Sequence, residues 1–325
     1  MRSSLIGLIA AAAAFAGCSK VSGDDLMPIR FSGATVTKAL VSDATGMQSR
    51  ISLYGFEKEP GGQEAVIFGN VPLSYLSSKS EWSYPGNIRY WIPDNRYTFI
   101  GLYPGEAEKY SNTGMSISFS HTITPYSHGD QQDLMAGCHY REFTRGGDAS
   151  AVVLPMRHLL SAVEFKIQNA CTSGTLDISN ISLTGLYTAG DCTLTPKPGE
   201  SDFTATWSPT GEPTGEESTH YNGDKAISAL AVGPANAQDA FQEMLLVIPQ
   251  DTDLESIKFR MTVDPSTVTG PSDAYDKVLS IADATNITAW EPGKKYTYIA
   301  SVSSERITFQ ILVHDWIEDE EHILK

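Results

Sequence analysis

The residues best suited to metal chemistry gather in one stretch of the sequence. This patch contains six residues of ligand type, His121, His128, Asp130, Asp133, Cys138 and His139. Histidine, cysteine and aspartate side chains bind metals, but this spacing matches no common zinc pattern. We therefore predict a polar loop, with no metal and no other cofactor.

Catalytic signatures are absent from the sequence. It contains no Gly-x-Ser-x-Gly elbow, no His-Glu-x-x-His and no phosphate-binding loop. Its 39 acidic residues supply carboxylate pairs by chance, as a glycosidase would need, but no local context selects two of them. We predict that the protein is not an enzyme. A secreted hydrolase is an alternative that requires a deep acidic cleft.

Four aromatic residues close together form a candidate sugar-binding platform: Trp82, Tyr84, Tyr90 and Trp91. An exposed row of Trp82, Tyr84 and Trp91 would favour an outer-membrane, glycan-binding lipoprotein of a polysaccharide-uptake system. The competing interpretation is that these rings fill the core or the edges of a β-sandwich, as Trp and Tyr commonly do.

The charge balance excludes one class of partner. The chain carries 23 Lys and Arg against 39 Asp and Glu, a net charge of −16. No basic block is present to neutralise phosphates, so we predict that the protein does not bind nucleic acid. The acidic balance also argues against adsorption to an anionic membrane surface.

The N-terminus has the form of a lipoprotein signal. Arg2 precedes an uncharged run from Leu5 to Gly17, which is too short to span a membrane. Ala16 and Gly17 come directly before Cys18, which predicts cleavage after residue 17 and lipidation of Cys18. Ordinary cleavage after Ala14-Phe15-Ala16 is the alternative. We predict a signal peptide at 1–17, a lipidated tether at 18–27 and attachment to the outer membrane.

Three cysteines remain after Cys18: Cys138, Cys171 and Cys192. At most one internal disulfide can form among them, with Cys171 and Cys192 as the candidate pair. Three buried thiols are the alternative.

The body of the chain alternates apolar and polar residues with period two, which is typical of half-buried antiparallel strands. Strict alternation covers 115–119, 163–168, 258–263 and 307–313, and strand-like runs cover 51–56, 97–103, 178–186, 245–248 and 296–302. Only 131–136 and 238–245 have a helical pattern. Frequent Pro-Gly turns between the short strands predict an all-β fold of antiparallel sandwiches. A break at Leu154-Pro155 predicts one sandwich at 28–155 and a second at 156–325.

Several phrases, in order along the chain, resemble the fimbrillin family of Bacteroidetes, whose members are lipoprotein precursors of type V pili. The matching phrases are Ile29–Phe31, Thr37–Ala39, Ile51–Phe56, Tyr97–Pro104, Gln132–Ala136, Met156–Phe165 and Trp290–Tyr298, with a final strand running to Trp316. The phrase Met156-Arg-His-Leu-Leu-Ser-Ala-Val-Glu-Phe165 resembles the family's entry to its C-terminal domain. The resemblance implies two transthyretin-like β-sandwiches in series.

The resemblance also implies a route of assembly. In stalk subunits of the family, a trypsin-like protease removes the lipidated first strand, and a donor strand from a neighbouring subunit fills the groove. Here the displaced strand would be Met27–Val36, with Ile29 and Phe31 on one face. The candidate maturation sites are Arg50 and Lys38, and an arginine-specific protease would find only Arg50 in that loop.

The C-terminal stripe of Ile307, Phe309, Ile311 and Val313 is the candidate donor strand, or else it closes the C-terminal sandwich. We predict a structural subunit, or a tip or accessory adhesin, of a cell-surface fimbrium. Its expected partners are other pilus subunits, bound by β-strand addition, and the outer membrane through the lipid on Cys18. Host or bacterial surface ligands are further candidates.

Overall fold

The computed structural model describes most of the chain between residues 27 and 316. The described residues are 27–32, 51–76, 78–79, 81–106, 109–123, 131–214, 221–222, 226–242, 244–250, 256–264, 275–280, 287–303 and 306–316. Several residues singled out from the sequence lie outside them, namely Cys18, Lys38, Arg50, His128 and Asp130. The predicted signal peptide at 1–17 and most of the tether at 18–27 also lie outside them.

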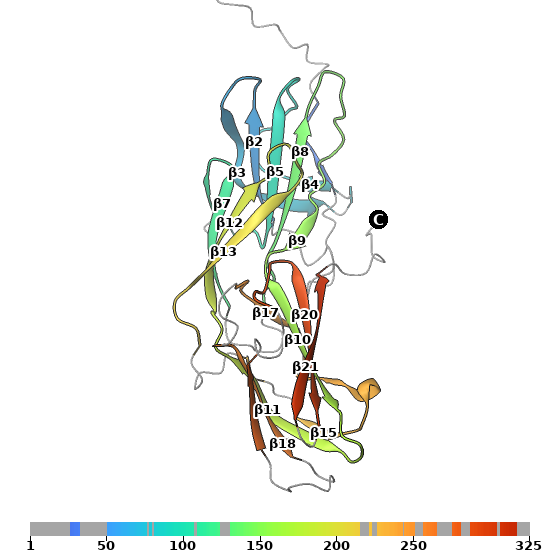
Figure 1. Ribbon diagram of the computed structural model, residues 1–325. Helices are drawn as coiled ribbons and strands as arrows, with labels where there is room; N and C mark the ends of the chain where they lie inside the picture. The colour runs from blue at the N-terminus through green and yellow to red at the C-terminus, as the bar shows by residue number, and fades with distance from the viewer. Residues whose placement is uncertain are drawn as a thin grey trace, which may run out of the picture.

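The molecule is long and narrow, with the N-terminal strands at one end and the C-terminal strands at the other (Figure 1). The described residues contain no α-helix, and a 3₁₀ turn, η2, spans Pro234–Asn236. The all-β prediction is thus confirmed. In the described part of the chain, no helix is long and apolar enough to cross a membrane.

A seven-stranded sheet forms one layer of the N-terminal end. In spatial order its strands are β1 (Phe31–Ser32), β4 (Glu81–Ser83), β3 (Glu64–Leu76), β2 (Ile51–Lys58), β5 (Arg96–Tyr103), β8 (Met135–Glu142) and β9 (Met156–His158). All neighbouring pairs are antiparallel. β2 and β5, in the middle, are buried on both faces. This burial explains why their sequences are almost continuous apolar runs.

The second N-terminal layer combines strands from distant parts of the sequence (Figure 1). Its order is β13 (Phe203–Thr210), β12 (Ala189–Pro196), β7 (Ser116–Thr122) and β6 (Ser111–Thr113). β12 pairs with β7 from Ala189↔Thr122 to Leu194↔Ile117. Strands from both sides of the predicted boundary at 155/156 therefore share one sheet. The division of the chain into two domains at this boundary stays a prediction.

Two five-stranded sheets form the C-terminal end. The first has the order β16 (Gln238–Asp239), β10 (Ser161–Asn169), β20 (Lys294–Val302) and β21 (Ile307–Asp315), and β17 (Leu245–Val247) also pairs with β10. The second has the order β14 (Tyr221–Asn222), β11 (Leu176–Thr184), β18 (Lys258–Asp264) and β19 (Tyr275–Ser280), and β15 (Ile227–Leu230) also pairs with β11. The β10–β20 pair is parallel, which differs from the predicted antiparallel sandwich.

The core consists of two clusters. The smaller one lies on the outer face of the seven-stranded sheet and includes Ile29, Phe31 and Phe99. The larger one contains Phe56 and Ile117 from the N-terminal layers, and it continues without a break into both C-terminal sheets. Apolar packing thus crosses the predicted boundary as strand pairing does.

The predicted alternation is confirmed where it was strict, because Val163, Phe165 and Ile167 of β10 are at most 1% exposed. The two helical predictions are wrong. Residues 131–134 are irregular and lead into β8, while residues 238–245 contain β16 and the start of β17. Long-range pairing overrides the local pattern here. The side chain of Gln131 donates to the Met244 carbonyl at 2.8 Å and accepts from the Leu246 N–H at 2.7 Å, as a neighbouring strand would.

Cys138, Cys171 and Cys192 are all buried free thiols, so the candidate pair of Cys171 and Cys192 is not joined. Burial raises the pKa of Cys138 to about 12, with the nearby Asp202 adding to the shift. Buried, protonated thiols of this kind are unreactive.

Candidate functional site: the N-terminal strand and the C-terminal edge strand

The N-terminal segment 27–32 is hydrogen-bonded along both of its sides. On one side, the Trp91 N–H donates to the Met27 carbonyl at 2.9 Å, and the Ile29 N–H donates to the Arg89 carbonyl at 2.8 Å. On the other side, the Val152 N–H donates to the Arg30 carbonyl at 2.7 Å, and the Ser32 N–H donates to the Val152 carbonyl at 2.9 Å. The segment thus occupies the place of an internal strand.

The side chains of this segment alternate between core and solvent. Ile29 and Phe31 are each 1% exposed, while Met27 and Arg30 are exposed. The Phe31 ring packs edge-on against Phe99 at 5.4 Å and Phe68 at 5.9 Å. Burial of two such side chains contributes about 1.5–3 kcal/mol each. Ile29 and Phe31 therefore fill apolar pockets that would open to water if the segment left.

Three of the four residues of the candidate sugar-binding platform belong to this same core, whereas Tyr90 is 38% exposed. Trp82 and Trp91 are buried, and Trp91 stacks on Phe143 at 5.4 Å. The Tyr84 hydroxyl donates to the Ile29 carbonyl at 3.1 Å, which ties this ring to the inserted segment. The exposed row of Trp82, Tyr84 and Trp91 that would favour glycan binding is not formed.

The C-terminal strand β21 lies at the end of its sheet (Figure 1). It pairs with β20 over its whole length, from Val302↔Ile307 to Lys294↔Asp315, and no described strand pairs with its other edge. Ile307, Phe309 and Ile311 are partly buried against the larger core, whereas Val313 is 42% exposed. The stripe therefore packs against the C-terminal core, and among the described strands only β20 pairs with β21.

The end of β21 is fixed by an aromatic stack that the sequence did not reveal. The Trp316 ring lies parallel to the His158 ring, with their centroids 3.5 Å apart. His158 Nδ1 is 2.8 Å from Asp133 Oδ2, and both side chains are fully buried. The Trp316 N–H also donates to the Gly293 carbonyl at 2.8 Å. The only sequence signal was a histidine inside the apolar phrase 156–165.

The described part of the histidine-rich patch is dispersed. Asp133 pairs with His158, and Cys138 points into the larger core. His121 Nδ1 is 3.3 Å from Lys109 Nζ, and burial together with this ammonium lowers the pKa of His121 to about 4. Among the described residues, no three His, Cys, Asp or Glu side chains lie close enough together to hold a metal ion.

These features define an elongated, all-β protein whose first described segment is paired on both sides and whose last described strand lies at the end of a sheet. The sequence model of the fimbrillin-like family matches residues 37–316, which is most of the chain. The chain therefore belongs to the fimbrillin-like family, as the phrases in its sequence predicted. Family membership supports a role as a pilus subunit and a structural, non-enzymatic function. No curated protein matches the sequence.

Several solved structures share the fold. A fimbrial protein from Bacteroides vulgatus superposes with a TM-score of 0.56 at 16% identity, and the alignment covers 88% of this chain and 99% of that one. A candidate cell adhesion protein from Bacteroides uniformis gives 0.53 at 16% identity, with 90% and 100% covered. Another from Bacteroides ovatus gives 0.50 at 15% identity, with 91% and 99% covered. At these identities, the likeness establishes the fold alone.

Proposed function

We propose that this protein is a subunit of a cell-surface pilus, exported as a lipoprotein through Cys18 and polymerised by strand exchange after proteolysis. Family membership supports the subunit role. The observation that carries the exchange is the segment 27–32, which is paired on both sides and inserts Ile29 and Phe31 into the core. A donor strand from another subunit takes its place in the polymer.

The position of the candidate cleavage site suits this exchange. Residues 33–50 join the segment to β2, whose first residue is the buried Ile51. Cleavage after Arg50 makes Ile51 the new N-terminus and leaves β2 intact. The segment 27–32 is then held only by hydrogen bonds and apolar contacts. Lys38, the other basic residue between positions 33 and 50, is the second candidate site.

Loss of the segment leaves a site that another strand can fill. The Arg89 carbonyl and the Trp91 and Val152 main-chain groups lose their partners within the chain and form unpaired strand edges, which another strand can pair with. The pockets of Ile29 and Phe31 become empty at the same time. An extended strand with apolar residues at alternate positions satisfies both needs, which is the physical basis of β-strand addition.

The proposed donor is β21 of a neighbouring subunit, with Ile307, Phe309, Ile311 and Val313 as its apolar residues. Val313 is already exposed, and the other three are only partly buried. A donor β21 must leave β20 and withdraw Trp316 from His158. The exchange therefore replaces one set of strand contacts with another.

Limited proteolysis tests the proposal. Cleavage of the monomer at Arg50 by an arginine-specific protease should produce multimers that resist SDS without boiling, and Arg50→Gln should prevent them while Lys38→Gln does not. Deletion of residues 306–325 should abolish the multimers, and a synthetic peptide of residues 306–316 should then bind the cleaved chain. A cleaved chain that stays monomeric at high concentration contradicts strand exchange and favours a tip or anchor role.

The lipid anchor is tested separately. Metabolic labelling with a fatty-acid probe should mark the wild-type protein, and Cys18→Ser should remove the label and leave the signal peptide attached. Incorporation of label by the Cys18→Ser protein contradicts lipidation at this residue.

A further inference from the structure

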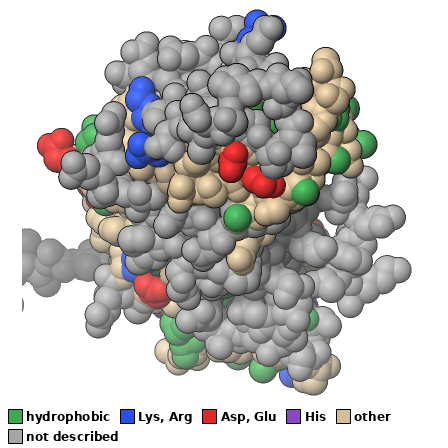
Figure 2. Space-filling model, turned by 90° about the horizontal axis from the view of Figure 1, so that it is seen from below, with side chains coloured by type: hydrophobic (Ala, Val, Ile, Leu, Met, Phe, Trp, Pro, Cys, Tyr) green, Lys and Arg blue, Asp and Glu red, His purple; other side chains and the backbone are tan. Residues whose placement is uncertain are grey.

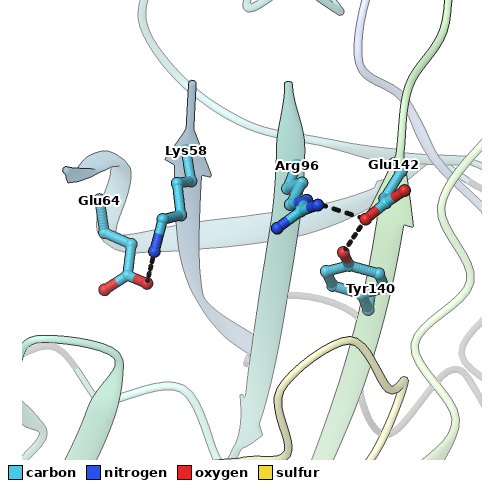
Figure 3. Close-up of polar contacts among 5 residues, drawn as sticks. All are labelled: Lys58, Glu64, Arg96, Tyr140 and Glu142. Atoms are coloured by element: carbon cyan, nitrogen blue, oxygen red, sulfur yellow. Dashed lines mark hydrogen bonds and ion pairs between the residues drawn. The ribbon is translucent and has the colours of Figure 1, made fainter. Parts of the chain in front are cut away.

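A row of four charged side chains crosses the seven-stranded sheet at its outer end (Figure 3). Lys58 is directly opposite Glu64 on β3 and Arg96 on β5, and Arg96 is directly opposite Glu142 on β8. Residues that face each other across antiparallel strands point to the same side of the sheet. The row therefore reads Glu64, Lys58, Arg96, Glu142, with both cations in the middle.

Among the described residues, each inner cation forms an ion pair only with the carboxylate on its outer side. Lys58 Nζ is 3.3 Å from Glu64 Oε1, and Arg96 Nε is 2.8 Å from Glu142 Oε1. Like charges directly opposite each other destabilise a sheet. Arg96 uses Nε for its ion pair, and its terminal nitrogens are offered no carboxylate by the described residues. Figure 3 shows that end of the guanidinium turned away from Glu142, toward the Lys58 side. An anion between Lys58 and Arg96 would relieve their repulsion.

These cations line a cleft at the open end of the N-terminal sandwich. Phe56 and Met115 supply apolar lining, and the β12–β13 turn from Pro196 to Gly199 also lines the cleft. Lys197 of this turn brings a third cation, and its Nζ forms an ion pair with Asp202 Oδ2 at 2.5 Å. Glu57 also lines the cleft, but its Oε1 accepts hydrogen bonds from Asn95 at 2.7 Å and Tyr97 at 2.8 Å. Glu64 lines the cleft as the partner of Lys58, so the cleft presents three cations, each with one carboxylate partner, to an incoming anionic group.

The size of the cleft selects the kind of anion. Its volume is about 120 Å³. A cavity of about 150 Å³ accepts one benzene ring, and pockets for whole small-molecule ligands are several times larger. The cleft therefore accommodates one or two carboxylate side chains from a larger partner. The ion pairs of Lys58 and Arg96 lie at the surface, where they are weak and can be shared with an incoming carboxylate.

The chain itself contains a suitable partner segment. The acidic run Glu318-Asp-Glu-Glu321 follows Trp316, at the end of the C-terminal edge strand. Copies of a chain with net charge −16 repel each other in general, so a cationic cleft is a place where this run would be attracted. At the C-terminal end, seen in Figure 2, the described charged side chains lie scattered in small groups of either sign. The cleft and the acidic run thus provide complementary charge for two copies joined end to end.

We propose that this cleft, lined by Lys58, Arg96 and Lys197, is a subunit contact site that binds carboxylates of the 318–321 run of a second copy. The proposal rests on the proposed pilus function, because a polymer brings the C-terminal end of one subunit to the N-terminal end of the next. The contact would fix the register and the orientation of one subunit relative to the next during strand exchange. Charge pairs across an interface mainly provide specificity of this kind.

A binding measurement on the uncleaved chain tests the contact. A fluorescent peptide of residues 316–325 should bind the wild-type protein and weaken markedly between about 0.05 M and 0.5 M salt, as screening requires. Lys58→Glu combined with Arg96→Glu should reduce its affinity at least tenfold. Lys79→Glu, which alters an exposed lysine in the β3–β4 turn, is the matched control and should leave the affinity unchanged. The milder pair Lys58→Gln and Arg96→Gln repeats the test if the reversed variant folds poorly.

A charge swap makes the test specific. A peptide with lysine at positions 318–321 should bind the doubly reversed protein and not the wild type. Equal binding of a peptide with glutamine at these positions would overturn the proposal. Binding of the peptide only after deletion of residues 317–325 would also overturn the proposal. That result would mean that the acidic run of each molecule occupies the cleft of the same molecule. Competition by an acidic sugar without any peptide binding would indicate a glycan site instead. Strand exchange is read from multimers of the cleaved chain, so either proposal can fail without the other.

Discussion

Phe165 lies in a stack of rings that joins the two C-terminal sheets. Its ring stacks on Phe259 of β18 at 4.6 Å and on Tyr298 of β20 at 5.0 Å, and its side chain is 1% exposed. Lys166, the next residue, points outward and forms surface ion pairs with Asp239 at 3.2 Å and Glu164 at 3.5 Å. Two adjacent residues of one strand therefore differ in what they contribute to stability.

Phe165→Ala should lower the free energy of unfolding by about 3–5 kcal/mol, because it removes a buried ring and leaves a cavity. Lys166→Ala should change it by about 0.5 kcal/mol, since exposed ion pairs contribute little. Urea denaturation followed by tryptophan fluorescence measures both values. Equal destabilisation by the two substitutions would show that the assignment of strand faces is wrong.

His121 should make stability depend on pH. Burial, with the Lys109 ammonium beside it, lowers its pKa from an ordinary value near 6.5 to about 4. Between these two pH values the unfolded chain binds a proton at this residue and the folded chain does not, so stability must fall as pH falls through this window. We expect the His121 ring to titrate near pH 4 by NMR. His121→Gln should reduce the loss of stability between pH 6.5 and pH 4, and an unchanged loss would exclude His121 as its source.

At the scale of elements, alternation identified the faces of strands but not their neighbours. The period of two in the sequence predicted strands β10 and β18 correctly. It also predicted correctly that Ile29 and Phe31 share one face. β12 could not be placed beside β7 from the sequence, because a period of two carries no information on which strand pairs with which. β3 has no regular alternation in its sequence, because its pairing with β2 contains register shifts and Asn70 has a positive φ of 55°. The contact of Trp316 with His158 likewise depends on the tertiary fold.

The end of β21 should depend on the Trp316 anchor. Trp316→Ala removes the stack on His158, so the last residues of the strand should open more often. We expect amide hydrogen exchange in residues 311–315 to accelerate at least tenfold. Leu312→Ala, at a position 41% exposed, is the control and should have little effect. Unchanged exchange in the Trp316→Ala protein would show that pairing with β20 alone holds the strand.

At the scale of the whole molecule, the two ends are linked by more than a short connection. β12 and β13 belong to the C-terminal half of the sequence, but they complete the second layer of the N-terminal end. The larger core is also continuous, since it contains Phe56 and Ile117 together with Phe165. Strand pairing and apolar packing therefore both join the two ends of the molecule.

The shared sheet makes a prediction about fragments. Residues 27–155 alone retain the seven-stranded sheet almost complete, but β7 loses its partner β12 and is left with only β6. Tyr54, Phe56 and Ile100, buried in the larger core, would then face water. We expect this fragment to lack a cooperative unfolding transition and a dispersed amide NMR spectrum. A single chain that joins residues 27–160 to the hairpin 186–212 through a Gly/Ser linker should recover both, because the hairpin restores the missing layer. Cooperative unfolding of residues 27–155 alone would show instead that the boundary at 155/156 separates two independent domains.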